Sequence, residues 1–282
     1  MTAGTVLPYL MVSLFGLAFG SFLNVCIWRL PRGESIISPR SRCPRCSKLI
    51  PWYDNIPVLS YFLLRARCRN CRERISPIYP AVELLTATVF IISYFQFDLS
   101  PAFVKHAVLG MLLIILVFTD LLVRRIPHPV TLLGMGLGVF LSVLIPVDPR
   151  PLEWLLMRSG IFLSPIFLSI LGAVTGSLLG GGLLYAVAEA FYRLTGKEGL
   201  GFGDVMMMLM VGTFLGVPLA LMTILLGSLL GTVVAVPFEL FSTRLRHHPW
   251  PFGSFLGIAG IFSSFWGPSL LALYLRWAGF TH

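Results

Sequence analysis

Charged side chains are scarce in this chain. Asp, Glu, Lys and Arg make up 12% of its 282 residues, whereas 56% of the residues are hydrophobic. A soluble domain of this composition would expose large apolar patches, because a single core could not bury so many apolar side chains. The mean hydropathy of +0.87 therefore argues against a soluble globular protein and favours a chain surrounded by lipid.

Several catalytic motifs are also missing. The chain has no H-E-x-x-H, no G-x-S-x-G, no P-loop lysine and no Rossmann G-x-G-x-x-G. Its five histidines form no metal-binding pattern, and we expect His247 and His248, in a basic loop, to be solvated. The chemistry must therefore be sought among the few acidic residues and the cysteines.

Long apolar runs separated by short polar segments recur along the chain. Each is close to the roughly 20 residues that cross a bilayer as a helix, so we expect an all-α polytopic membrane protein. The first run lacks the basic start and the small-residue cleavage site of a signal peptide, and we expect it to be a retained helix. We interpret eight runs as helices, at about 7–28, 80–97, 107–123, 129–146, 166–192, 204–216, 218–240 and 253–275.

The basic residues predict the orientation of these helices. Seventeen of the 21 Lys and Arg residues lie in the first, third, fifth and seventh loops, and four lie in the other segments. Because Lys and Arg accumulate on the cytoplasmic side, we expect a multi-pass protein of a bacterial inner membrane with both termini periplasmic. The net charge of +9 then reflects membrane topology and lipid contact, and we expect no nucleic-acid partner.

Four of the five cysteines lie in one polar segment, 29–78, as the pairs Cys43/Cys46 and Cys68/Cys71. A segment of this size is too small to fold on an apolar core alone. Two C-x-x-C motifs in a reducing compartment are typical of a four-cysteine zinc site, which would be structural because no ligand position stays open. The alternative is four idle or redox-active thiols. Cys26, in the first run, is expected to be a packing residue.

Carboxylates at membrane depth are expensive unless they have a task or a partner. Asp120 lies near the cytoplasmic end of the third predicted helix and Asp204 at the cytoplasmic start of the sixth, so both should lie at one depth. Two such carboxylates can share a proton and act as base and acid on a peptide bond. The acidic residues within or beside apolar runs are Glu83, Asp120, Glu189, Asp204 and Glu239.

Simpler roles exist for these acids. Asp120 could form an ion pair with Arg124, and Asp204 could be an ordinary N-cap. Glu83 is ambiguous, and Glu189 and Glu239 are expected to be interfacial. Elsewhere, the four-residue spacing of Gly172, Gly176 and Gly180, and of Gly134 and Gly138, predicts close helix packing.

Six segments of the chain resemble the type IV prepilin leader peptidases that also act as N-methyltransferases. The resemblance runs along nearly the whole chain. The segments are FGSFLNVCIWRLP at 19–31, WYDNIP at 52–57, ISPIYPAVE at 75–83, Asp120 with the later Ile126 and Pro127, GFGD at 201–204, and PFG at 251–253.

The resemblance implies a membrane aspartic endopeptidase with Asp120 and Asp204 as its catalytic aspartates. Its substrates would be prepilins or pseudopilins, cleaved after a glycine and then methylated at the new amino terminus by S-adenosylmethionine. The expected domains are a first transmembrane helix at 1–28, a cytoplasmic zinc-binding domain associated with methyl transfer at 29–78, and a seven-helix peptidase domain at 79–282.

Two positions depart from the family pattern. Met206 replaces a common lysine, and His128 replaces an acidic or amide residue. Neither change removes a carboxylate, although a charge that tunes the pair is missing. The alternatives are a peptidase without methyltransferase activity, an ion-coupled transporter whose Asp120 and Asp204 bind ions, and a noncatalytic assembly scaffold.

Overall fold

The computed structural model describes residues 3–150, 152–197, 199–241 and 250–279, and these are helical without a named strand. The side chains of 3–5 and 238–241 are not part of this description, so Glu239 lies outside it, as do Arg244, Arg246, His247 and His248. The helices are α1 (Ala3–Arg29), η1 (Leu30–Arg32), η2 (Trp52–Asn55), α2 (Leu59–Leu63), α3 (Ile78–Phe97), α4 (Pro101–Val123), α5 (His128–Leu144), α6 (Leu152–Arg158), α7 (Pro165–Thr195), α8 (Phe202–Phe241) and α9 (Phe252–Trp277).

Six of the described helices are long and apolar enough to cross a membrane, namely α1, α3, α4, α7, α8 and α9, and α5 is a shorter apolar helix. The expectation of an all-helical, multi-pass membrane protein is confirmed at this level. The expected boundaries agree with the helices to within a few residues, except that two expected runs, 204–216 and 218–240, join in α8. The count of eight membrane crossings stays a prediction.

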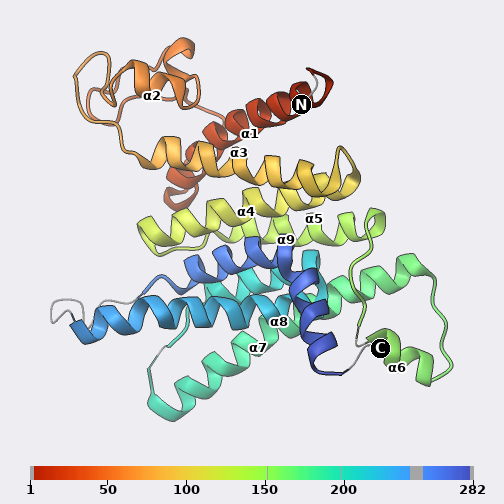
Figure 1. Ribbon diagram of the computed structural model, residues 1–282. Coiled ribbons are helices and arrows are strands. Elements are labelled where there is room, and N and C mark those ends of the chain that lie inside the picture. Colours follow the sequence, from red (N-terminus) through yellow and green to blue (C-terminus); the bar gives the residue numbers. More distant parts are fainter. Residues whose placement is uncertain (1–2, 151, 198, 242–249, 280–282) are drawn as a thin grey trace. The chain divides into compact units, whose positions relative to one another are not determined.

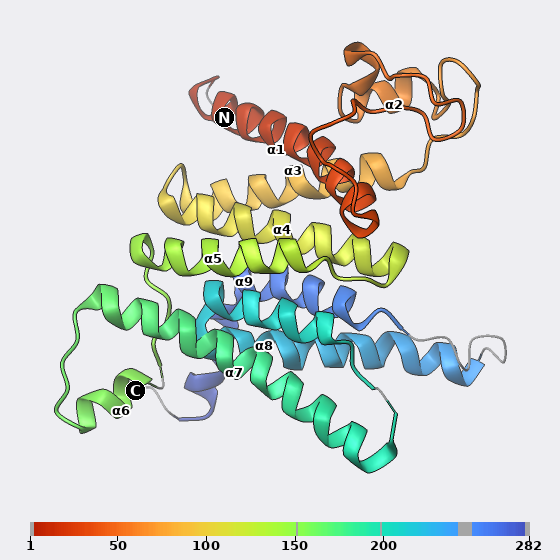
Figure 2. The ribbon, with the colours of Figure 1, turned by 180° about the vertical axis from the view of Figure 1, so that it is seen from behind.

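The chain divides into two compact units, residues 1–115 and 116–282. In the first unit, α1 and α3 lie against each other, with the polar segment around α2 beyond one end of the pair (Figure 2). The two helices approach so closely that a Cβ atom at Gly16 would lie 2.6 Å from Ala87 Cα, and one at Gly20 would lie 2.6 Å from Glu83 Cα. Glycine is therefore required at both positions in α1.

The second unit is built around α8, which lies alongside α7 and also contacts α5 and α9 (Figure 1). A Cβ atom at Gly176 of α7 would lie 2.6 Å from the carbonyl oxygen of Gly212 and from the Cα of Gly216, both in α8. Gly138 of α5 packs against Thr213 and Phe214 of the same helix. The prediction that these spaced glycines lie at helix interfaces is confirmed at Gly176 and Gly138.

Gly216 interrupts α8 with non-helical backbone angles, φ 73° and ψ −179°. A positive φ of this size is accessible to glycine without steric strain, and Pro218 two residues later cannot donate a helical hydrogen bond. The break coincides with the expected division between 204–216 and 218–240. The first part of α8 thereby ends where the sequence predicted the end of its sixth helix.

The contact of Gly176 with α8 predicts a strong difference between two glycines of one helix. Gly176→Ala should lower the free energy of unfolding by about 1–3 kcal/mol, because the new methyl group meets backbone atoms that have no room to move. Gly182→Ala, whose methyl group would have no neighbour within 4 Å, is the control and should be neutral or stabilising. Thermal unfolding of the purified proteins in detergent measures both, and equal midpoints would contradict this packing.

Candidate functional site

Asp120 and Asp204 are positioned by the ends of two different helices. Asp120 lies in the last turn of α4, and Asp204 is the third residue of α8. Each is only 7% exposed. The helix dipole stabilises an acidic side chain in the first turn of a helix. This stabilisation offsets part of the cost of placing Asp204 among apolar side chains.

The two carboxylates converge beside Gly253, the second residue of α9. A Cβ atom at Gly253 would lie 2.7 Å from Asp204 Oδ1 and 3.1 Å from Asp120 Oδ2. The two oxygens are therefore at most 5.8 Å apart, the sum of these distances. The same Cβ atom would lie 2.8 Å from Ile126 Cδ1, so an apolar side chain closes the other side of this space.

Ser254 supplies the hydrogen bonds to Asp120. Its backbone N–H donates to Asp120 Oδ2 over 2.8 Å, and its hydroxyl lies 3.0 Å from the same oxygen and 3.1 Å from the carbonyl oxygen of Val117. Ser254 is 1% exposed. The sequence marks Ser254 only through the adjacent PFG segment at 251–253, so the contact with Asp120 was not predicted.

The structure shows how each acid is placed relative to the simpler roles, and the pairing of Asp120 with Arg124 stays an alternative. Asp204 lies inside the first turn of α8 and not at its N-cap. Arg124 donates its backbone N–H to the carbonyl of Asp120, at 2.9 Å, and ends the helix there with φ 53°. Glu189 is the acid that forms an i,i+4 ion pair, with Arg193 at 2.7 Å on the exposed part of α7.

The four cysteines predicted to form a metal site come together. The sulfur atoms of Cys43, Cys46, Cys68 and Cys71 all lie within 4.8 Å of one another, and those of Cys43 and Cys71 are 3.7 Å apart. Zinc–sulfur bonds of about 2.3 Å in a tetrahedron separate the sulfurs by about 3.8 Å. The cluster therefore fits a metal ion held by four thiolates.

Both cysteine pairs sit in the same kind of backbone turn. The N–H of Cys43 donates to the carbonyl of Lys48 and the N–H of Ser47 to that of Cys43; Cys68 makes the equivalent bonds with Glu73 and Arg72. The residue after each pair has a positive φ, 57° at Ser47 and 59° at Arg72. This shared turn points backbone N–H groups toward the sulfurs. Without a metal the four thiols influence one another. The pKa of Cys68 is lowered to about 7 by the backbone N–H groups of Cys71 and Asn70, whereas the pKa of Cys71 is raised to about 11, so the support for a metal site is the placement of the sulfurs.

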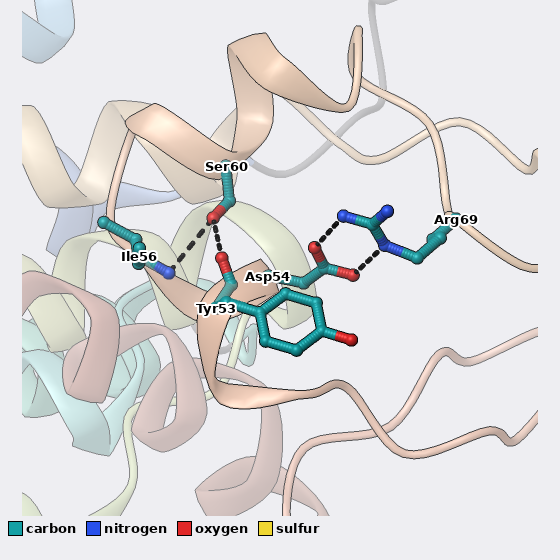
Figure 3. Close-up of polar contacts among 5 residues, drawn as sticks. All are labelled: Tyr53, Asp54, Ile56, Ser60 and Arg69. Carbon is teal, nitrogen blue, oxygen red and sulfur yellow. Dashed lines mark hydrogen bonds and ion pairs between the residues drawn. The ribbon is translucent and has the colours of Figure 1, made fainter.

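The segment between the two turns is held by polar contacts (Figure 3). The carboxylate of Asp54 receives two hydrogen bonds from the Arg69 guanidinium, at 2.7 and 2.6 Å, which lowers the pKa of Asp54. The hydroxyl of Ser60 donates to the carbonyl of Tyr53 and accepts from the N–H of Ile56. These bonds connect η2, α2 and the second cysteine turn in a segment that has little apolar core.

Two family descriptions match the chain. The bacterial peptidase A24 N-terminal domain matches residues 14–97, and the type IV leader peptidase family matches residues 107–236. The first match contains all four clustered cysteines, and the second contains Asp120 and Asp204.

Relatives with similarity over most of the chain carry one description, prepilin leader peptidase/N-methyltransferase. The protein of Aeromonas hydrophila is 34% identical over 298 residues, with 95% of each chain covered. That of Pseudomonas aeruginosa is 31% identical, with 95% of this chain and 93% of the relative covered. That of Myxococcus xanthus is 38% identical over 239 residues, which cover 84% of this chain and 65% of the relative. No solved structure matches the chain.

Proposed function

Because the chain belongs to the type IV leader peptidase family, we propose that it cleaves the leader of prepilins and pseudopilins by an aspartic mechanism and then N-methylates the new terminus. The observation that carries the proposal is that Asp120 and Asp204 are both buried and converge. Their nearest carboxylate oxygens are at most 5.8 Å apart, which is the sum of the distances from a Cβ atom at Gly253 to each oxygen. Both acids are buried, in contrast to Glu189, whose ion pair with Arg193 lies on the exposed part of α7.

The two aspartates would work as one unit with a single proton. Two ionised carboxylates this close in an apolar site repel each other, so the favoured state has one carboxylate and one carboxylic acid. The carboxylate removes a proton from water as the water oxygen attacks the scissile carbonyl. The acid protonates the carbonyl oxygen, and the later collapse of the tetrahedral intermediate breaks the C–N bond as the leaving amine takes a proton.

We assign the role of base to Asp120. The backbone N–H of Ser254 donates to its Oδ2 over 2.8 Å, and such a donor stabilises the ionised form of a carboxylate. The Ser254 hydroxyl, whose one proton can go to Asp120 or to the Val117 carbonyl, lies 3.0 Å from the same oxygen. Asp204 then carries the proton. Met206 and His128, the two departures from the family pattern, leave this arrangement intact because neither replaces one of the two acids.

The depth of the aspartates would select the bond that is cleaved. We place the active site and the cysteine segment on the cytoplasmic side of a bacterial inner membrane and both termini in the periplasm, with α8 crossing in two parts around Gly216. A pilin helix in the bilayer would present the junction with its basic leader at this depth. A glycine before the cleaved bond leaves the backbone uncrowded for attack.

The cysteine segment would serve the second reaction. We assign structural zinc to Cys43, Cys46, Cys68 and Cys71, within a domain of 29–78 that lies between the first helix at 1–28 and the peptidase domain at 79–282. S-adenosylmethionine supplies an electrophilic methyl group on a sulfonium. When bound, it would supply this methyl group to the amine nitrogen of the processed terminus, with the C–S electron pair remaining on sulfur and one proton released by the amine.

The dyad predicts that Asp120→Asn and Asp204→Asn each lower the rate of leader removal by at least about 100-fold, because an amide neither shares nor transfers the proton. Cleavage of a purified prepilin in detergent, followed by mass spectrometry, measures this rate. Glu189→Gln makes the same chemical change at an exposed helix position and should cleave like the wild type. Wild-type rates in either aspartate variant would rule out the dyad.

The close approach at Gly253 provides a test that keeps both acids. Gly253→Ala should fold, since alanine favours a helix and the nearest atom is the movable end of the Asp204 side chain. The displaced carboxylate should reduce kcat by roughly 100-fold, with a smaller change in KM. Gly136→Ala, which meets no atom within 4 Å in α5, is the control. An unchanged kcat for Gly253→Ala would contradict this geometry.

The four-thiolate site predicts that Cys43→Ser loses most of its bound zinc and becomes more sensitive to proteolysis within 29–78, because structural zinc contributes directly to folding. Metal analysis of the purified protein and limited proteolysis measure the two effects. Cys26→Ala, in which a buried packing residue of α1 is changed, should retain the metal. Zinc content equal to that of the wild type in Cys43→Ser would count against the site.

A further inference from the structure

The first unit contains a cavity of about 600 Å³ that the aspartate pair does not share. It lies between the C-terminal end of α1, the N-terminal end of α3 and the cysteine segment, and all of its lining residues fall within 21–83. Its volume is within the range of about 300–1,000 Å³ that is typical of small-molecule sites. The cavity therefore has the size of a site for a nucleoside-sized ligand.

Glu83 forms the most unusual part of this cavity. It is 7% exposed, and its Oε2 accepts a hydrogen bond of 2.7 Å from the backbone N–H of Val58. Val58 holds this N–H in place with a φ of 60°, which is rare for a β-branched residue and persists where the surroundings fix it. A buried carboxylate and a strained backbone thus meet at one point of the lining.

Glu83 is the buried acid of a lining that holds charges of both signs. Asp54 pairs with Arg69 at 2.6 Å, Glu73 pairs with Arg45 at 3.1 Å, and Glu34 is exposed. The basic residues of the lining are Arg29, Arg42, Lys48, Arg69 and Arg74, and no ion pair of the described residues joins any of them to Glu83. A buried carboxylate is stabilised by a positive charge, so a ligand cation placed beside Glu83 would supply one.

The remaining lining adds polar and aromatic groups to this acid. Asn24, also 7% exposed, donates its side-chain amide to the carbonyl of Tyr79 over 3.0 Å, which leaves its amide oxygen as an acceptor. The rings of Trp28, Tyr61 and Tyr79 belong to the same lining. Aromatic faces attract both flat bases and cations. Together with Glu83, these groups match a cationic nucleoside.

We propose that this cavity binds S-adenosylmethionine, with the Glu83 carboxylate facing the cationic end of the molecule and the aromatic side chains contacting its base. The inference rests on the proposed methyltransferase activity and extends it by locating the site of the methyl donor. It assigns Glu83 a binding role separate from the aspartate pair. It also explains why a carboxylate is retained in the first turns of an apolar helix, where burial without a ligand is unfavourable.

Binding of radiolabelled S-adenosylmethionine to the purified full chain in detergent tests the proposal. Glu83→Gln should raise the Kd at least tenfold, since it removes the charge but keeps an oxygen that can accept from the N–H of Val58. Asp98→Asn is the control, because Asp98 is an exposed acid at the end of the same helix and is absent from the lining. Its Kd and the zinc content of both variants should equal those of the wild type.

Ultraviolet crosslinking of the bound label to the wild-type chain gives a second readout that does not depend on a variant. The labelled peptide should fall within 21–83. A crosslink confined to residues after 115, or an unchanged Kd in Glu83→Gln, would overturn the assignment.

Assays of the same preparations separate this inference from the proposed function. Cleavage and methylation by the wild type, together with an unchanged Kd in Glu83→Gln, would leave the proposed function in place and move the donor site elsewhere. Cleavage by a wild type that neither binds the donor nor methylates the product would end the methyltransferase assignment and this inference with it. Normal cleavage with weakened donor binding in Glu83→Gln would support both.

Discussion

Two buried carboxylates meet in one apolar space of the second unit, where two ionised groups so close together would repel each other. Asp120 and Asp204 reach the same point because Gly253 has no side chain to fill it. Any larger residue there would separate the carboxylates or displace them. The helix ends that carry the two acids therefore converge at the start of α9, which supplies both the open space and the backbone N–H of Ser254 that donates to Asp120.

The first unit uses the same physical device for a different acid. Gly20 in α1 allows the backbone of α3 to approach at Glu83, where a Cβ atom at Gly20 would lie 2.6 Å from the Glu83 Cα. Apolar helices in lipid gain little from hydrophobic association, so close backbone contact at small residues is what fixes their spacing. In both units a glycine sets the position of a buried carboxylate. The close contacts that hold the helices together therefore also fix where each buried carboxylate lies.

The sequence predicted those features that depend on local pattern. Apolar runs of bilayer length predicted the helices, and the two C-x-x-C motifs predicted the cysteine cluster. It did not predict Ser254 as the partner of Asp120, because these residues are 134 positions apart and their contact depends on how α4 and α9 pack. The same holds for Glu83, whose bond to Val58 joins a helix to a loop. Spacing rules describe one element, whereas these contacts arise between elements.

The polar segment and the helices of the first unit stabilise each other through that bond. Val58, which precedes α2, has a positive φ in a segment with two cysteine turns, a few polar contacts and little apolar core. The bond of the Glu83 carboxylate with the N–H of Val58 ties the segment to α3 at the edge of the cavity. A metal ion that orders the two cysteine turns would thereby also order a wall of the cavity, although it lies outside the reacting groups. A structural metal in this position would help to shape a cavity that the small segment could not maintain alone.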